Sequence, residues 1–199
     1  MYLYGASGHA KVIIDIANSM GLPVDGVFDD NKSVACLNDY KVKHQWAGEE
    51  PMIISIGNNR IRKMIAERLC CQFIKAVHSS AVLSPSVAVG DGSVVMAGAI
   101  INAEAVIGKH CIINTGASID HECRISDYVH ISPHATLCGN VSVGEGSWVG
   151  AGSVVIPGVK IGKWCTIGAG AVVIRDVPDN AVVAGVPAKI IKYNEADIL

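Results

Sequence analysis

The sequence predicts a parallel β-helix built from six-residue repeats, preceded by a small parallel α/β domain. Two patterns support this fold class. The later part of the chain carries a six-residue aliphatic period with small residues two positions earlier, and the first part alternates strands, glycine turns and helices. The composition agrees, because 50% of the 199 residues are hydrophobic, only 5% are aromatic and 21 are glycine. That balance is typical of a solenoid with many tight turns and small interior side chains.

The aliphatic period continues without a gap from residue 77 to residue 173. Its members are Val77, Leu83, Val89, Val95, Ile101, Ile107, Ile113, Ile119, Ile125, Ile131, Leu137, Val143, Val149, Val155, Ile161, Ile167 and Val173. Small residues such as Ala99, Ala117 and Ala135 lie two positions earlier, and Gly, Asn, Asp or Ser mostly follow directly. Each hexad therefore predicts a short strand and a corner, and three hexads predict one coil of a triangular prism.

The first part of the chain is expected to form a small parallel α/β domain of Rossmann-like type. The expected elements are strands at 1–4, 24–28 and 52–56, a helix ending at Met20, a helix at 60–71 and a short final strand at 73–76. At the other end the repeat register fails at Asp179, so residues 180–192 are expected to cap the last coil. The predicted domains are the α/β domain at 1–75, the β-helix at 76–178 and a C-terminal cap at 179–199.

The charge and the cysteine pattern argue against several classes of protein. A formal net charge of −2 gives no surplus positive charge for a nucleic-acid backbone. Neither a basic, apolar leader nor a run of about 18 apolar residues is present, so a cytoplasmic protein without membrane insertion is expected. The cysteines form no CxxC pair, which argues against a zinc knuckle. Cys111, Cys123 and Cys165 fall in the inward column and are expected to pack in the core.

Two glycine turns, Gly5-Ala-Ser-Gly8 and Gly57-Asn-Asn-Arg60, directly follow predicted strands. In parallel sheets such turns expose backbone N–H groups and helix N-termini to phosphate, although both can equally be plain strand-to-helix turns. Asp29 and Asp30 end the second strand, where carboxylates meet a ribose or a base edge, and they favour a nucleotide. His9, Lys11 and Arg60 are then phosphate-side candidates, with solvated helix residues as the alternative.

Three histidines, His121, His130 and His134, fall within about one coil. Three imidazoles can ligate zinc, so a metal or binding protein that uses the prism as a scaffold is one alternative. Their positions in the hexad differ, however, and no shared face gathers them in one chain. The sequence therefore predicts no metal.

His121 lies between Asp120 and Glu122, so an imidazole has carboxylates beside it. A neighbouring carboxylate fixes the tautomer of the ring and raises its basicity, as a general base near neutral pH requires. The alternative is a surface histidine that happens to lie beside acids.

Several motifs accompany the hexads: the Gly-Ala-Ser-Gly-His start, Asn114-Thr, Asp120-His-Glu-Cys123, Gly139-Asn140 and Gly185-Val-Pro-Ala-Lys189. Together they resemble the sialic-acid O-acyltransferase-like sugar acetyltransferases, and most of all the UDP-4-amino-sugar N-acetyltransferases of bacillosamine biosynthesis. The resemblance covers nearly the whole chain and implies that the β-helix is left-handed. The first strand begins at once at Met1 and is shorter than the family's usual one.

The resemblance also implies roles for individual residues. His121 matches the family's catalytic base and Glu122 its carboxylate partner. Asn114 and His130 match positions that line the acceptor and acetyl pocket. The residues that match the groove for the pantetheine arm are Gly139, Gly150 and Gly168. Those that match the nucleotide site are Ser7, Gly8, His9, Lys11, Asp29, Asp30, Ile56, Gly57 and Arg60.

The expected function is direct transfer of an acetyl group from acetyl-CoA to the 4-amino group of a UDP-linked 4-amino-4,6-dideoxy-N-acetyl sugar. We also expect a homotrimer, because the groove for the ligands needs a second wall. The sequence leaves open O-acetylation of a sugar or sialic acid, a GDP- or dTDP-linked acceptor, and assistance to His121 from His130 or His134.

Overall fold

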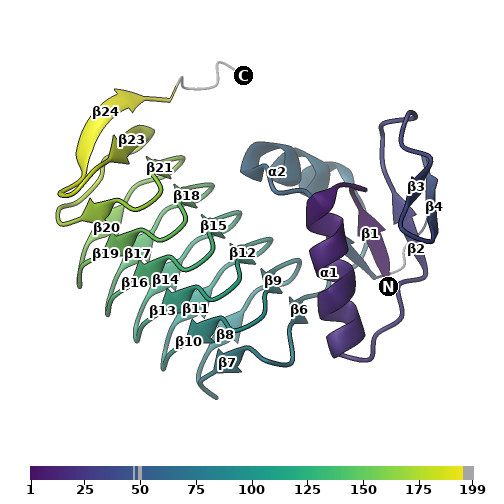
Figure 1. The fold of residues 1–199 in the computed structure, drawn as a ribbon, viewed down its shortest axis with the longest axis horizontal. Helices are drawn as coiled ribbons and strands as arrows, with labels where there is room; N and C mark the ends of the chain where they lie inside the picture. The colour runs from purple at the N-terminus through teal and green to yellow at the C-terminus, as the bar shows by residue number, and fades with distance from the viewer. Residues whose placement is uncertain (47, 49–50, 195–199) are drawn as a thin grey trace.

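The computed structural model describes residues 1–46, 48 and 51–194 of the chain. It is a parallel β-helix with a small α/β region beside its first coils (Figure 1). The fold class predicted from the sequence is therefore confirmed. No helix among the described residues is long and apolar enough to cross a membrane.

The α/β region is a five-stranded sheet between two helices, α1 (Gly8–Ser19) and α2 (Asn59–Arg68). Three neighbouring strands of this sheet, β2 (Gly26–Phe28), β1 (Tyr2–Tyr4) and the edge strand β5 (Met52–Ile54), are parallel. Alternate strand residues point to opposite faces, so Leu3 packs with α1 whereas Tyr4 packs with Ile65 of α2. This alternation leaves both faces of the sheet covered by a helix.

The remaining two strands form a hairpin that sequence reasoning missed. β3 (Cys36–Leu37) and β4 (Tyr40–Lys43) are antiparallel to each other, and β4 pairs in parallel with β2. β3 is only two residues long and two of the four residues of β4 are lysines, so both lack the apolar run that predicts a strand. The strand expected at 73–76 is also different, because Phe73 makes only an isolated bridge to Met52, whereas Ala76 already begins the β-helix.

The β-helix consists of three sheets, numbered here in chain order. Sheet 1 contains β6 (Ala76–Val77), β9 (Val94–Val95), β12 (Ile112–Ile113), β15 (His130–Ile131), β18 (Trp148–Val149) and β21 (Thr166–Ile167). Sheet 2 contains β7 (Val82–Leu83), β10 (Ile100–Ile101), β13 (Ser118–Ile119), β16 (Thr136–Leu137), β19 (Val154–Val155) and β22 (Val172–Val173). Sheet 3 contains β8 (Ala88–Val89), β11 (Val106–Ile107), β14 (Arg124–Ile125), β17 (Ser142–Val143) and β20 (Lys160–Ile161).

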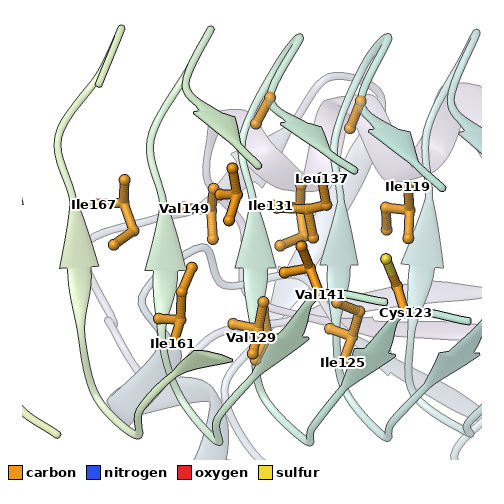
Figure 2. Close-up of a cluster of buried hydrophobic side chains, with 14 of the residues drawn as sticks. Ile119, Cys123, Ile125, Val129, Ile131, Leu137, Val141, Val149, Ile161 and Ile167 are labelled. Atoms are coloured by element: carbon orange, nitrogen blue, oxygen red, sulfur yellow. The ribbon is translucent and has the colours of Figure 1, made fainter. Parts of the chain in front are cut away.

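The aliphatic column fills the interior of the prism, as Figure 2 shows for Ile119, Ile131 and Leu137. Successive coils pair in register, for example Ile113 with Ile131 and Ile131 with Val149. Cys111, Cys123 and Cys165 are buried in the same core, as predicted. Truncating one interior isoleucine to alanine removes its packing on two neighbouring coils and is expected to cost about 2–5 kcal/mol.

The far end of the prism is covered by a hairpin. Val177 bridges to Ile161 after a shortened turn. β23 (Ala181–Ala184) then pairs in parallel with β21, and β24 (Lys189–Tyr193) folds back antiparallel onto β23 (Figure 1). The last five residues of the expected cap lie outside the described part of the chain.

The α/β region covers only the first coils of sheet 1. The outward side chains of Ala76, Val94 and Ile112 are buried in one apolar cluster with Ile13 of α1. The outward faces of β15, β18 and β21 extend beyond this contact. They carry His130, Trp148 and Thr166, and this exposed stretch of sheet 1 forms the floor of the candidate site.

Candidate functional site

The two glycine turns lie side by side, because β1 and β5 are neighbours in the sheet. The hydroxyl of Ser55 donates to the Gly5 carbonyl at 2.6 Å. Gly5 has a φ of 116°, and a Cβ there would lie 2.6 Å from the side chain of Ile56, so the close approach requires glycine. The structure thus brings the turn at 5–8 next to the turn at 56–58.

The predicted acids take different places near these turns. Asp29 accepts hydrogen bonds from the backbone N–H of Ala6 at 2.7 Å and of Asn31 at 2.8 Å, so it braces the first turn. Asp30 accepts from Tyr4 and from Arg68 on the α2 side of the sheet. The hydrogen bond from Tyr4 lowers the pKa of Asp30, and Arg68 lowers it further. Asp30 is therefore an ionised partner of Arg68 at neutral pH.

Two cavities lie on the floor formed by sheet 1. The first, of about 590 Å³, is lined by Gly57 and Arg60 from the α/β region and by His130, Trp148 and Trp164. The second, of about 390 Å³, continues past Trp148 and His130 to Gly150 and Gly168. His130 and Trp148 line both cavities, so the two spaces adjoin at these side chains.

His130 is held from several sides. Its Nε2 lies 3.1 Å from the Asn114 amide nitrogen, and its ring stacks on Trp148 with centroids 5.8 Å apart. The Trp148 Nε1–H donates to the Ser132 hydroxyl at 2.6 Å, which fixes the indole. Burial lowers the pKa of His130 to about 3, helped by the positive charge of Arg62 and by His9. His130 is therefore neutral at physiological pH and acts there through hydrogen bonds.

The other predicted nucleotide residues surround the first turn. Ser7 is exposed directly before α1, Gly8 begins the helix, and Lys11 is exposed on it. Burial lowers the pKa of His9 to about 4, with Arg62 contributing. The Nε2 of His9 is buried without a hydrogen-bond partner among the described residues. His9 is thus a neutral ring with one polar atom that has no partner among the described residues. Arg60 lies elsewhere, with its guanidinium 4.6 Å from the centre of the Trp164 ring.

His121 and Glu122 lie at a different edge of the prism. They form the turn between β13 of sheet 2 and β14 of sheet 3, so their edge is opposite sheet 1. The His121 Nδ1 is 3.0 Å from a Glu122 carboxylate oxygen, and both side chains are more than half exposed. The imidazole lies over Gly139, where a Cβ would be 2.6 Å from ring atoms. The ring is therefore oriented by a carboxylate and supported by a glycine.

The predicted residues thus form two groups in one chain. The first contains the 57–60 turn, His130, Gly150 and Gly168, which line the two cavities on sheet 1, together with the 5–8 turn that lies beside the 57–60 turn. The second contains His121, Glu122 and Gly139 at the edge between sheets 2 and 3. The packed core of the prism separates the two groups. His134 lies at the edge between sheets 1 and 2 over Gly116, so the three histidines do not converge.

Comparison with known proteins identifies the family of the chain. Residues 1–69 match the family model of the PglD N-terminal domain, and residues 140–175 match that of the bacterial transferase hexapeptide. A crystal structure of a perosamine N-acetyltransferase from Caulobacter crescentus, in complex with CoA and GDP-perosamine, is 41% identical. It superposes with a TM-score of 0.92 over 96% of each chain.

The chain belongs to the hexapeptide-repeat sugar N-acetyltransferases. The resemblance inferred from the sequence is therefore confirmed. The acetyltransferase domain of PglB from Neisseria gonorrhoeae, solved with acetyl coenzyme A, is 36% identical with a TM-score of 0.88, over 96% of this chain and 98% of that one.

A curated relative extends the comparison within these sugar N-acetyltransferases. The UDP-N-acetylbacillosamine N-acetyltransferase of Bacillus subtilis is 44% identical over 48% of this chain. The chain spans 50% of that protein and 21% of an uncharacterized mimivirus protein that it also matches.

Sequence reasoning missed Trp148 and Trp164, which line the first cavity, and Arg62, which joins α2 to the β-helix. Trp148 occupies an outward position in a hexad, where a large aromatic ring is a usable signal of a ligand face. Trp164 fills the space beside Gly146, where a Cβ would lie 2.3 Å from its ring. Arg62 carries no signal in the sequence, because its role arises only when α2 packs on the β-helix.

Proposed function

We propose that the chain is an acetyl-CoA-dependent N-acetyltransferase acting on the 4-amino group of a UDP-linked 4-amino-4,6-dideoxy-N-acetyl sugar. One observation carries the proposal: the second glycine turn, which lies beside the first, lines one cavity with His130, and His130 also lines the adjoining cavity. Family membership supplies the reaction class. Metal chemistry plays no part in the proposal, because direct acyl transfer from a thioester needs none.

The two cavities divide the substrates between them. Of the proposed nucleotide-sugar residues, Gly57 and Arg60 line the first cavity. The others proposed for this substrate are Ser7, Gly8, His9, Lys11, Asp29, Asp30 and Ile56, with Asn114 toward the sugar. The helix N-terminus at Gly8 and the N–H groups of both turns suit a diphosphate. In the second, His130, Gly150 and Gly168 are the proposed contacts of the pantetheine arm and the acetyl group, because a narrow extended chain can approach bare backbone there.

The proposed reaction needs one base and no acyl-enzyme. The amine nitrogen attacks the thioester carbon while His121 Nε2 takes one amine proton, and Glu122 holds the opposite ring nitrogen. The backbone N–H of Gly139, beside the ring, is the proposed donor to the oxyanion. Collapse of the tetrahedral intermediate breaks the C–S bond, and the CoA thiolate receives the proton from the imidazolium.

A homotrimer is the arrangement that joins the two residue groups. The outward face of sheet 2 is mostly apolar, and Val82 and Ile100 are 62% and 43% exposed. The outward face of sheet 3 instead carries Arg124 and Lys160. If sheet 2 faces a threefold axis, the edge bearing His121 meets the neighbour's edge between sheets 1 and 2. That edge carries Asn114 and lies beside Gly150 and Gly168.

The trimer has its own test in Ile100→Asp. A carboxylate on the apolar face of sheet 2 should dissociate the assembly, as measured by light scattering at micromolar concentration. Arg124→Asp, on the outward face of sheet 3, is the matched control and should leave the mass unchanged. A monomeric wild-type protein would rule out the shared site.

A GDP-linked 4-amino sugar is the second candidate acceptor. It is favoured by the likeness to the perosamine N-acetyltransferase solved with GDP-perosamine. An activity screen decides between them: acetyl-CoA is offered with UDP-, GDP- and dTDP-linked 4-amino sugars, and release of the CoA thiol is followed. We expect the UDP sugar to give the highest kcat/KM. Turnover of hydroxyl acceptors alone would overturn N-acetylation.

A further inference from the structure

Helix α2 is docked on one edge of the β-helix in an unusual way. The edge between sheets 3 and 1 carries Gly92, His110, Tyr128, Gly146 and Trp164, all with positive φ. We call this set the edge column. Three carbonyl groups of the column, those of His110, Tyr128 and Gly146, accept hydrogen bonds from side chains of α2. α2 meets them with a row of polar and basic side chains.

Arg62 is the centre of that contact and is only 1% exposed. Its Nε donates to the His110 carbonyl at 2.8 Å, and one terminal nitrogen donates to the Tyr128 carbonyl at 2.9 Å. The same nitrogen donates to Asn59 Oδ1 at 2.8 Å. The other terminal nitrogen donates to the carbonyls of Ile56 at 3.0 Å and Gly57 at 3.2 Å. All five N–H groups of the guanidinium are thereby used.

Each of these acceptors is an uncharged oxygen. A buried cation surrounded by neutral acceptors costs several kcal/mol of desolvation, which hydrogen bonds offset only when the geometry is good. Simple attachment of α2 does not require this, since the neighbouring Lys63 already pairs with Glu145 of the β-helix. The distinctive feature of Arg62 is that it joins two β-helix carbonyls to the two carbonyls of the 56–57 turn.

That turn is part of the candidate site. Gly57 and His130 line the same cavity. Asn59, which Arg62 also holds, donates to the Gly146 carbonyl at 3.0 Å, one coil further along the column. The position of the turn relative to His130 is therefore set through the guanidinium. Burial is the main cause of the low pKa of His130, and the positive charge of Arg62 lowers that pKa further.

We propose that Arg62 is a positioning residue, which fixes the 56–57 turn against the edge column so that the nucleotide turn and His130 keep a constant spacing. This inference rests on the proposed function, because that function assigns the 56–57 turn to the nucleotide. Lysine cannot replace arginine here, because an ammonium group has three donors and no planar fork, and would leave acceptors unpaired.

The test compares Arg62→Lys with Lys63→Met, a control that removes a neighbouring α2 contact without touching the turn. Hydrogen–deuterium exchange of a peptide covering residues 55–60 reports on the turn itself. Calorimetry with UDP, GDP and CoA reports on binding. Arg62→Lys should speed exchange in this peptide and raise the Kd of the nucleoside diphosphate at least about tenfold, or about 1.4 kcal/mol. The Kd of CoA should change by less than about twofold.

Chemical rescue gives a second measure. In Arg62→Ala, guanidinium ion at tens of millimolar can occupy the vacated site and should restore nucleotide affinity, whereas NaCl at the same concentration should not. The proposal is overturned if Lys63→Met has the same effects, if Arg62→Lys leaves exchange unchanged, or if nucleotide and CoA affinities fall equally. If the wild type binds neither UDP nor GDP, the proposed function fails, whereas the exchange comparison still decides whether Arg62 fixes the turn.

Discussion

The two histidines of the candidate site occupy opposite kinds of environment. His130 is half-buried on the floor of the candidate site between Asn114 and Trp148, and burial lowers its pKa to about 3. His121 is 57% exposed at the far edge of the prism, with a carboxylate on one ring nitrogen. A ring that stays neutral can orient a ligand, whereas an exposed ring with an orienting carboxylate can accept and return a proton. The difference separates the positioning histidine from the proposed base.

The largest expected effect comes from removing the proposed base. His121→Ala should lower kcat by at least about 10²-fold, the lower end of general-base effects, while leaving both KM values and the trimer unchanged. Steady-state kinetics with light scattering measures both. His130→Ala is the competing variant. Near-full turnover by His121→Ala together with loss of activity in His130→Ala would reverse the two assignments.

A smaller effect is expected from enlarging the first glycine turn. Nothing in the protein lies within 4 Å of a Cβ built at Gly8, so a valine there adds bulk toward the space proposed for the diphosphate. We expect Gly8→Val to raise KM for the nucleotide sugar about tenfold, or about 1.4 kcal/mol, and to spare CoA. Asn18→Val, at an exposed position near the other end of α1, is the control. Equal losses for both substrates would count against separate cavities.

The sequence predicted the β-helix because its core depends on a periodic pattern that tertiary contacts do not override. It also predicted the His121–Glu122 pair, since adjacent residues in one turn share an environment. The hexad register also predicts that the two residue groups lie apart in one chain. Gly139 lies one coil after His121, whereas Gly150 and Gly168 follow strands of sheet 1. The docking of Arg62 was not predictable, because four of its five acceptors are backbone carbonyls, which carry no sequence signal.

A loss of kcat smaller than that of His121→Ala should follow from removing the carboxylate partner of His121. Glu122→Ala takes away the carboxylate 3.0 Å from Nδ1, but Gly139 still supports the ring from below. We expect a loss of roughly tenfold in kcat, smaller than for His121→Ala. Glu104→Ala, one coil earlier on the same edge, is the control and should be neutral. If Glu122→Ala cost as much as His121→Ala, the two residues would act as one inseparable unit.

The last effect concerns stability rather than turnover, and it tests the buried side of the comparison. Burial lowers the pKa of His130 to about 3 and those of His9 and His110 to about 4, against an ordinary value near 6.5. Between about pH 6.5 and pH 4 the unfolded chain therefore binds protons that the folded chain does not. The free energy of unfolding should fall as the pH is lowered through this window, because protons stabilise the unfolded state.

The measurement is the slope of Tm against pH from pH 7 to pH 4. Each of these histidines adds up to about 1.4 kcal/mol per pH unit, so His130→Asn should flatten the slope even if it lowers Tm at pH 7. His134→Asn, at the exposed position over Gly116, should leave the slope unchanged. The pH window also separates this effect from that of Asp30. The pKa of Asp30 is lowered in the fold, so the stability that this carboxylate contributes is lost only when the pH falls below its ordinary range. A slope that His130→Asn does not alter would mean that His130 has the same pKa in the folded and unfolded chains, and the division between a buried neutral ring and an exposed base would fail.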